Sequence, residues 1–165
     1  MVEKDKECEV DIFRDTAVRY LGYTNEVGEA FRSIVPKSVV WSSYVVACGY
    51  VLADTVHKGL HVYNEDSSPQ KTKRLLLSTS DTLLWQGFAS VIIPGLTINR
   101  LCATIRYLQT KSSRPMLRSP WISTIIGLAS IPVIIHPIDV LVEDSMNATY
   151  RKWTGYKPLE PIQST

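Results

Sequence analysis

The sequence predicts an all-α, multi-pass membrane helical bundle, with three spans and an N-terminal amphipathic helix. Three long runs, residues 38–53, 82–99 and 119–138, contain no charged residue. The last two have the length of roughly 17–25 residues that a helix needs to cross a bilayer. The first becomes long enough if its helix begins near Ile34 and Lys37 extends its ammonium group back to the headgroups. Backbone amides in hydrocarbon must be bonded within their own segment, so these spans are expected to be helices.

The whole-chain averages conceal this segregation of charge. The mean hydropathy is +0.00 and 45% of the residues are hydrophobic, as in an ordinary soluble domain. All 18 basic and 16 acidic residues, however, lie outside the three runs. A soluble helical domain shows polar residues at helical intervals along each apolar segment, and these runs do not. Trp41, Trp85 and Trp121 lie near the start of each run, where indole rings favour the membrane interface.

The elements are expected in the following order. Residues 1–10 are acid-rich and expected to be disordered, residues 11–145 form one membrane helical domain, and residues 146–165 form a polar tail. Within the domain, 11–35 is expected to be amphipathic, with apolar residues near helical spacing. The spans are expected at about 34–55, 80–99 and 119–138, with a loop at 64–69 and a helix cap at Ser80 or Asp81. The apolar positions of the amphipathic helix are Phe13, Ala17, Leu21, Val27, Phe31 and Ile34.

Prolines and small residues suggest how the spans pack. Pro94 and Pro132 lie inside spans and predict kinks, because proline removes a helix hydrogen bond and clashes with the preceding turn. Pro137 is expected to help end the third span. Small residues four apart, such as Ser43/Ala47, Gly49/Ala53 and Ser123/Gly127, allow helix backbones to approach closely.

No sequence pattern typical of an enzyme is found. There is no glycine-rich phosphate loop, CxxC pair or nucleophile elbow, so we expect neither an enzyme nor a cofactor. His57 and His61 have metal-ligand spacing, but a solvated helix end explains them better than a metal site. The basic link 100–118 has no acid and is expected on the positive side of the membrane, together with the N-terminus. Its basic residues are candidates for contact with anionic lipids: Arg100, Arg106, Lys111, Arg114 and Arg118.

Antiparallel threading brings four ionisable residues to one membrane face. Asp54, Asp81, His136 and Asp139 mark the ends of the three spans. Ionisable groups at membrane depth are candidates for a proton relay or a cation site. The alternative is that charges simply begin where spans end, in which case neutral replacements are expected to be mild.

The N-terminal residues do not have the pattern of a cleavable address. A mitochondrial presequence is rich in Arg and poor in acids, whereas the first 15 residues carry six acids and three bases. We therefore expect no cleavable presequence.

Three stretches resemble the mitochondrial fission process protein 1 family. Residues 19–36 (RYLGYTNEVGEAFRSIVP) resemble its N-terminal signature, and residues 81–100, ending IIPGLTINR, resemble its second hydrophobic segment. Residues 131–139 (IPVIIHPID) are similar to its third. The resemblance implies a multi-pass protein of the mitochondrial inner membrane that takes part in mitochondrial division.

The family provides no catalytic or cofactor residues to carry over. The expected partners are the lipid bilayer and other inner-membrane proteins, with no nucleic acid and no small-molecule substrate. Two functions remain open: a non-enzymatic organiser of the inner membrane, and a small proton or ion conductor, or a modulator of inner-membrane permeability and respiratory coupling, built around His136 and the boundary carboxylates.

Overall fold

Helices make up most of the residues that the structure describes. The structure is a computed structural model that describes residues 13, 17–65, 69–113 and 118–158. No strand occurs in these residues, which confirms the all-α prediction. The elements are η1 (Ala17–Tyr23), α2 (Thr24–Phe31), α3 (Lys37–Glu65), α4 (Lys71–Gln86), η2 (Gly87–Ile92), α5 (Ile93–Lys111), α6 (Pro120–Ala148) and α7 (Tyr150–Thr154).

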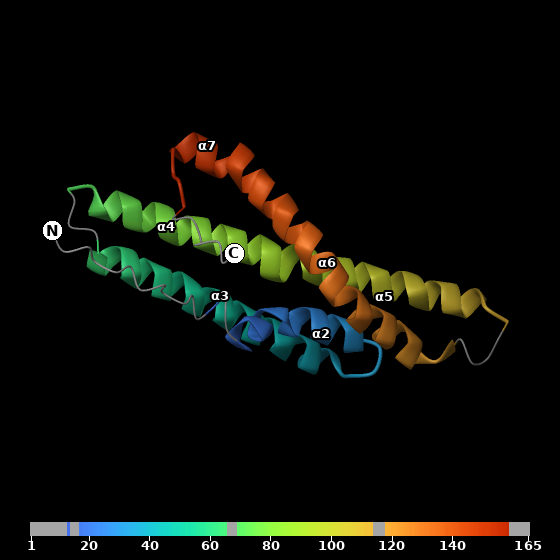
Figure 1. Ribbon diagram of the computed structural model, residues 1–165. Helices are drawn as coiled ribbons and strands as arrows, with labels where there is room; N and C mark the ends of the chain where they lie inside the picture. Colours follow the sequence, from blue (N-terminus) through green and yellow to red (C-terminus); the bar gives the residue numbers. More distant parts are fainter. Residues whose placement is uncertain (1–12, 14–16, 66–68, 114–117, 159–165) are drawn as a thin grey trace.

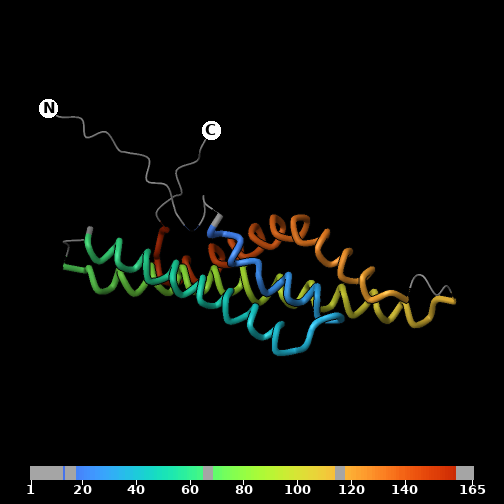
Figure 2. The backbone as a smooth tube through the Cα atoms, turned by 90° about the horizontal axis from the view of Figure 1, so that it is seen from below, coloured from blue at the N-terminus to red at the C-terminus, as the bar shows by residue number. Residues whose placement is uncertain are grey.

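Three helical segments form the body of the molecule. α3 and α4 run antiparallel, and α4, η2 and α5 follow one another as an almost continuous rod (Figure 1). α6 returns across this rod, and α7 lies against α6 and α4. The short helix α2 packs against α3, α5 and α6 (Figures 1 and 2). The segments Lys37–Asn64, Lys71–Lys111 and Pro120–Thr154 are long and apolar enough to cross a membrane.

The helices extend beyond the uncharged runs. α4 begins at Lys71, so Ser80 and Asp81 lie inside this helix and do not cap it as expected. α3 begins at Lys37 rather than near Ile34, because a turn over 32–36 ends in Pro36, the residue before the helix. Helical backbone satisfies its own hydrogen bonds in water as well as in lipid, so the first charged residue does not end a helix.

The third long helix continues through both of its prolines. α6 contains Pro132 and Pro137 and ends only at Ala148, so Pro137 does not end this helix. Beyond Pro137, its buried side chains pack around Ala89 of η2, and this burial favours continued helix. Figure 2 shows that α6 follows a curved path. The packed side chains are Ile138, Val142 and Met146.

The second long helix has an irregular segment next to Pro94. The residues just before this proline form the π-helical element η2. The amide of Asn25 donates to the carbonyl of Val91 at 3.0 Å. Proline and π-helical geometry both interrupt the regular pattern of backbone hydrogen bonds in a helix. The Asn25 side chain of α2 therefore donates a hydrogen bond to a carbonyl of this irregular stretch.

The N-terminal segment turns polar residues inward and exposes part of its apolar stripe. The stripe residues Leu21, Val27 and Ile34 are exposed and Phe13 and Phe31 are partly buried, whereas the polar residues Asn25 and Glu26 are completely buried. The segment also changes from η1 to α2 at Thr24, rather than forming one helix. This inverted pattern suits a helix whose outer face contacts lipid and whose inner face finds polar partners. Of residues 11–16, only Phe13 is described.

Candidate functional site

The carboxylate of Asp54 is part of a buried polar chain between α3 and α4. Asp54 has no exposed surface. Its Oδ2 atom accepts hydrogen bonds from Lys58 Nζ at 3.0 Å and Gln86 Nε2 at 2.6 Å. Ser90 Oγ then donates to Gln86 Oε1 at 2.7 Å. These contacts join α3 to α4 and η2, so Asp54 holds two predicted spans together.

The carboxylate of Asp81 pairs with a residue from the last described helix. Arg151 of α7 donates to both oxygens of Asp81, from Nε at 2.7 Å and from Nη2 at 2.9 Å. Arg151 also contacts Glu143 and donates to Asn147 at 2.9 Å. Both Asp81 and Arg151 are buried, and bidentate pairs of this kind fix geometry strongly. The pair therefore anchors α7 and the end of α6 to α4.

The other two boundary residues have different surroundings. Asp139 lies 3.4 Å from Arg19 of η1, in a partly exposed ion pair, while the His136 side chain is exposed on α6. Each of the three carboxylates therefore has a different charged partner: Lys58 for Asp54, Arg151 for Asp81 and Arg19 for Asp139. Within the described ranges, no group of three or more His, Cys, Asp or Glu side chains is placed to hold a metal ion. Their role as a functional site stays a prediction.

The described basic residues of the 100–118 link lie on α5 and just beyond its end. Arg100, Arg106 and Lys111 are exposed on α5, and the ammonium of Lys111 lies 4.8 Å from the centre of the Tyr107 ring. Arg118 is exposed and donates to the Ser112 carbonyl. Arg114 lies outside the described residues. The exposed positions are compatible with the lipid contacts that the sequence predicts.

The sequence did not reveal how deeply α2 is inserted in the bundle, and small residues make that insertion possible. A Cβ atom on Gly28 would lie 2.9 Å from the Cβ of Ser43 on α3. A Cβ on Gly95 of α5 would lie 2.9 Å from the Asn25 amide nitrogen. Ser43, one of the small residues expected to bring spans together, therefore contacts α2.

Ala30 of α2 makes a third close contact with a long helix, at Gly127. A Cβ on Gly127 of α6 would lie 3.1 Å from the Ala30 Cβ. Ser33, just after α2, lies 3.4 Å from Ser123 between the two hydroxyl oxygens. α2 is thus enclosed by three long helices, which is a tight docking site for an eight-residue element.

The Glu29 cluster, composed of Glu29, Arg32, Tyr44 and Asn99, connects three elements. Glu29 is 1% exposed and accepts from Tyr44 Oη of α3 at 2.9 Å and from Asn99 Nδ2 of α5 at 2.8 Å. Arg32 binds both of its oxygens. Burial by itself raises the pKa of Glu29, but these donors outweigh it and lower the pKa below its ordinary value. Glu29 is therefore an ionised structural group.

Glu26, one turn earlier on α2, has no such compensation. It is completely buried, and neither carboxylate oxygen has a hydrogen-bond partner among the described residues. Burial raises its pKa from 4.5 to about 8. The raised pKa favours the protonated form of this carboxyl group near neutral pH. Its location points to a proton-binding position that the sequence analysis did not identify.

One signal in the sequence points to this site. Asn25, Glu26 and Glu29 share a side of α2 with Gly28 and Ala30. Small residues next to acidic ones suggest close approach of another backbone. The exposed apolar stripe gave the stronger but misleading signal, because apolar periodicity does not distinguish a core-facing side from a lipid-facing one.

A match to one protein-family model shows the family to which the chain belongs. The family model described as "Mitochondrial 18 KDa protein (MTP18)" matches residues 11–82 and 64–146. The chain belongs to this family. The match confirms the resemblance found in the sequence, and it includes both α2 and the three long helical segments except for the end of the last.

Relatives from several animals share one name. The protein "Mitochondrial fission process protein 1" of Caenorhabditis elegans is 54% identical over 145 residues, covering 86% of this chain and 87% of the relative. The Homo sapiens protein of the same name is 50% identical over 148 residues, covering 88% and 89%. The Danio rerio protein of that name is 47% identical over 145 residues, covering 87% and 88%. No solved structure matches the chain.

Proposed function

We propose that this chain takes part in mitochondrial division as a non-enzymatic, multi-pass protein of the mitochondrial inner membrane that organises that membrane with protein partners. The observation that carries the proposal is the name shared by relatives that are 47–54% identical over nearly the whole chain. At that identity, over that length, a shared role in division is the simplest inference.

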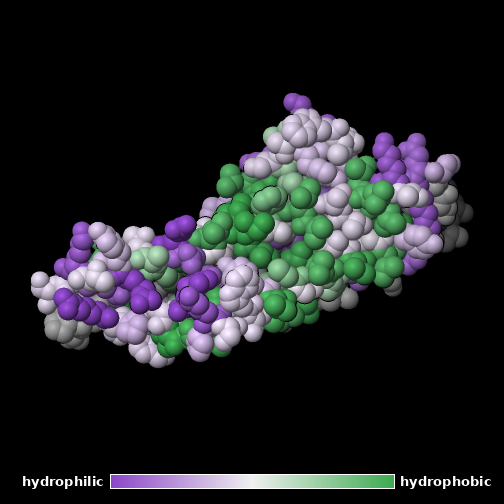
Figure 3. Space-filling model, turned by 180° about the vertical axis from the view of Figure 1, so that it is seen from behind, coloured by the Kyte–Doolittle hydropathy of each residue, from purple (hydrophilic) through white to green (hydrophobic). Residues whose placement is uncertain are grey.

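The surface and the helix lengths support a membrane location. Three described segments have the length and composition to cross a bilayer. Figure 3 shows apolar residues gathered over the middle of one face, with hydrophilic residues towards its two ends. Many large apolar side chains are exposed, including Val45, Ile126 and Val133, which favours contact with lipid over water. The N-terminus and the basic link would then lie on the matrix side.

The use of polar groups supports an organising rather than a catalytic role. The buried carboxylates of Glu29, Asp54 and Asp81 each join separate helices through hydrogen bonds. Such groups fix the arrangement of a bundle whose exposed faces are then available to partners.

The experiment uses cells that lack the relative with which this chain shares 50% identity. Expression of the full chain should restore the distribution of mitochondrial lengths in human cells. In intact mitochondria the chain should resist protease and carbonate extraction, and it should become accessible to protease once the outer membrane is opened. A chain that is correctly inserted at normal abundance but does not restore mitochondrial shape would contradict the proposal.

One observation favours the second candidate function, proton conduction or modulation of inner-membrane permeability. Glu26 is a buried carboxyl group without a partner among the described residues, and its pKa is raised to about 8. Proton flux should be measured in vesicles that contain the full chain, Glu26→Gln or His136→Gln. Flux lost only in Glu26→Gln supports conduction through α2, and flux lost only in His136→Gln supports the boundary site. An absence of flux in all three supports the organiser.

A further inference from the structure

A cleft opens between the end of α2 and the start of α3. Its volume is about 170 Å³, and its lining residues are Arg32, Val40, Trp41 and Tyr44. We call it the Arg32 cleft. Trp41 is 72% exposed, so the cleft is reached directly from the surface. Val40 is buried and forms an apolar wall.

Arg32 provides a fixed set of hydrogen-bond donors at this cleft. Its Nε atom donates to Glu29 Oε2 at 2.6 Å, and its Nη2 atom donates to the other oxygen. A guanidinium group has five N–H groups, so three remain outside this pair. The side chain is 43% exposed, and the buried carboxylate holds it in place. An incoming anion therefore meets a preorganised donor group.

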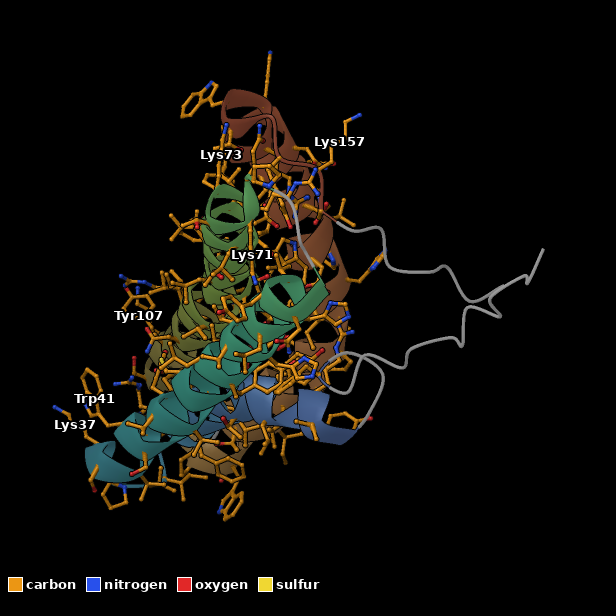
Figure 4. All side chains as sticks on the ribbon, turned by 90° about the vertical axis from the view of Figure 1, so that its left-hand side faces the viewer. Lys37, Trp41, Lys71, Lys73, Tyr107 and Lys157 are labelled. Atoms are coloured by element: carbon orange, nitrogen blue, oxygen red, sulfur yellow. The ribbon has the colours of Figure 1, made fainter. Side chains whose placement is uncertain are left out.

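The charge around the cleft favours an anion. Lys37 is exposed and lies one turn before Trp41 on the same side of α3; Figure 4 shows both side chains projecting from this end of the helix. Glu29, the carboxylate bound to Arg32, already accepts from Arg32, Tyr44 and Asn99. The cleft also adjoins the N-terminal end of α3, where the helix dipole favours negative charge.

The position of the cleft along the bundle matches the membrane interface. α3 is long and apolar enough to cross a membrane, and the cleft lies at its first turns. An exposed Trp near the end of such a helix prefers the interface between headgroups and acyl chains. Ser33, next to Arg32, donates to the carbonyl of Pro120 at 3.5 Å, which brings the start of α6 to the same level.

We propose that the Arg32 cleft binds one anionic phospholipid, whose phosphate accepts hydrogen bonds from Arg32 and Lys37 while its glycerol and upper acyl chains pack on Trp41 and Val40. This rests on the proposed membrane location of the chain. It differs from the predicted contacts of the 100–118 link, because here an arginine and an aromatic ring line one space, and an exposed lysine lies one helical turn before that ring. A zwitterionic lipid carries a cationic group for which Glu29, already occupied, offers no free partner.

The test measures contact between Trp41 and lipids of defined charge. The full chain with Trp85→Phe, Trp121→Phe and Trp153→Phe retains Trp41 as its only indole. It is reconstituted in phosphatidylcholine nanodiscs that contain the same fraction of either brominated phosphatidylglycerol or brominated phosphatidylcholine. Bromine quenches nearby indole fluorescence. We expect the anionic lipid to quench Trp41 more strongly.

A second indole serves as the control. A variant that retains only Trp153, which is 82% exposed on α7, should be quenched equally by the two lipids if either reaches it. Equal quenching of Trp41 by both lipids overturns the lipid site but leaves the membrane location intact. An absence of quenching by both overturns the membrane location as well.

Charge variants locate the binding groups. Lys37→Gln should weaken the preference for the anionic lipid about fivefold, since a basic residue near an anionic surface contributes about that factor. Lys73→Gln, an exposed lysine at the start of α4, is the matched control and should leave the preference unchanged. Equal effects of the two variants would show a diffuse attraction and overturn the cleft. Inorganic phosphate should not reduce quenching, and its doing so would assign the cleft to a soluble anion.

Discussion

α2 and α6 use opposite means to hold their places in the same bundle. The eight residues of α2 bury Asn25, Glu26 and Glu29, while its apolar Val27 faces outward. The first two thirds of α6 carry no charge, and its charged contacts lie in its last third, where Asp139 meets Arg19 and Glu143 meets Arg151. The comparison shows that polar contacts position the short helix, whereas length and apolar surface position the long one.

The largest effect is expected at the charged end of α6. Arg151→Ala removes the partner of Asp81 and leaves its carboxylate buried. Loss of one partner from a buried pair costs about 3–5 kcal/mol, so thermal unfolding in detergent should occur at a much lower temperature. α7 should also become sensitive to protease.

The matched control replaces both partners. Asp81→Leu together with Arg151→Met should recover most of the loss, because no charge stays buried. The sequence alone led us to expect a mild effect of Asp81→Asn; the bidentate pair instead leads us to expect clear destabilisation. Wild-type unfolding temperatures in Arg151→Ala would contradict the role of this pair.

The apolar part of α6 should be next in sensitivity. Ile126 is exposed in the uncharged run, where Arg costs about 2.5–3.5 kcal/mol for membrane insertion. Ile126→Arg should therefore lose much of the protein from the carbonate-resistant membrane fraction. Ser145→Arg, near the end of the same helix, should remain integral. Full insertion of Ile126→Arg at normal abundance would show that this part of α6 does not lie in lipid.

A smaller loss of stability is expected where α2 packs against α3. Gly28→Ala places a methyl group against Ser43, and overpacking of this kind costs about 2 kcal/mol. Gly49→Ala on α3 is the control, since no atom lies within 4 Å of its added Cβ. That control should be neutral or slightly stabilising, because Ala is the better helix former. Equal unfolding temperatures for the two variants would show that α2 is not tightly enclosed.

An effect comparable to that of Gly28→Ala concerns the proton on Glu26. Its pKa is about 8 in the folded state against an ordinary 4.5, so the folded protein holds the extra proton between these values. Stability should then fall as pH rises through this window, by up to about 1.4 kcal/mol per pH unit.

The measurement is the unfolding temperature at about pH 6 and about pH 8. Glu26→Gln should flatten the difference, because the amide cannot ionise. Asp144→Asn, an exposed carboxylate on α6, should leave it as it is in the wild type. An unchanged pH dependence in Glu26→Gln would mean that this carboxyl group has an ordinary pKa.

Parts of the candidate site were within reach of sequence reasoning. The uncharged runs led to the three long helices, and Asp54 and Asp81 were selected because antiparallel threading brings the ends of the spans, with their ionisable residues, to one membrane face. Their partners Gln86 and Arg151 lie 32 and 70 residues away, and no spacing rule relates them. The Glu29 cluster was missed because its donors, Tyr44 and Asn99, come from two other helices.

The sequence by itself determined the helical class, the number of membrane-length segments and the family, because these depend on local composition and on strings of neighbouring residues. Only the tertiary structure decided which face of α2 is buried and where α6 ends. Apolar periodicity identifies two faces of a helix, but the neighbouring helices determine which face turns inward. In α2, Gly28 and the donors around Glu29 make the polar face the inner one.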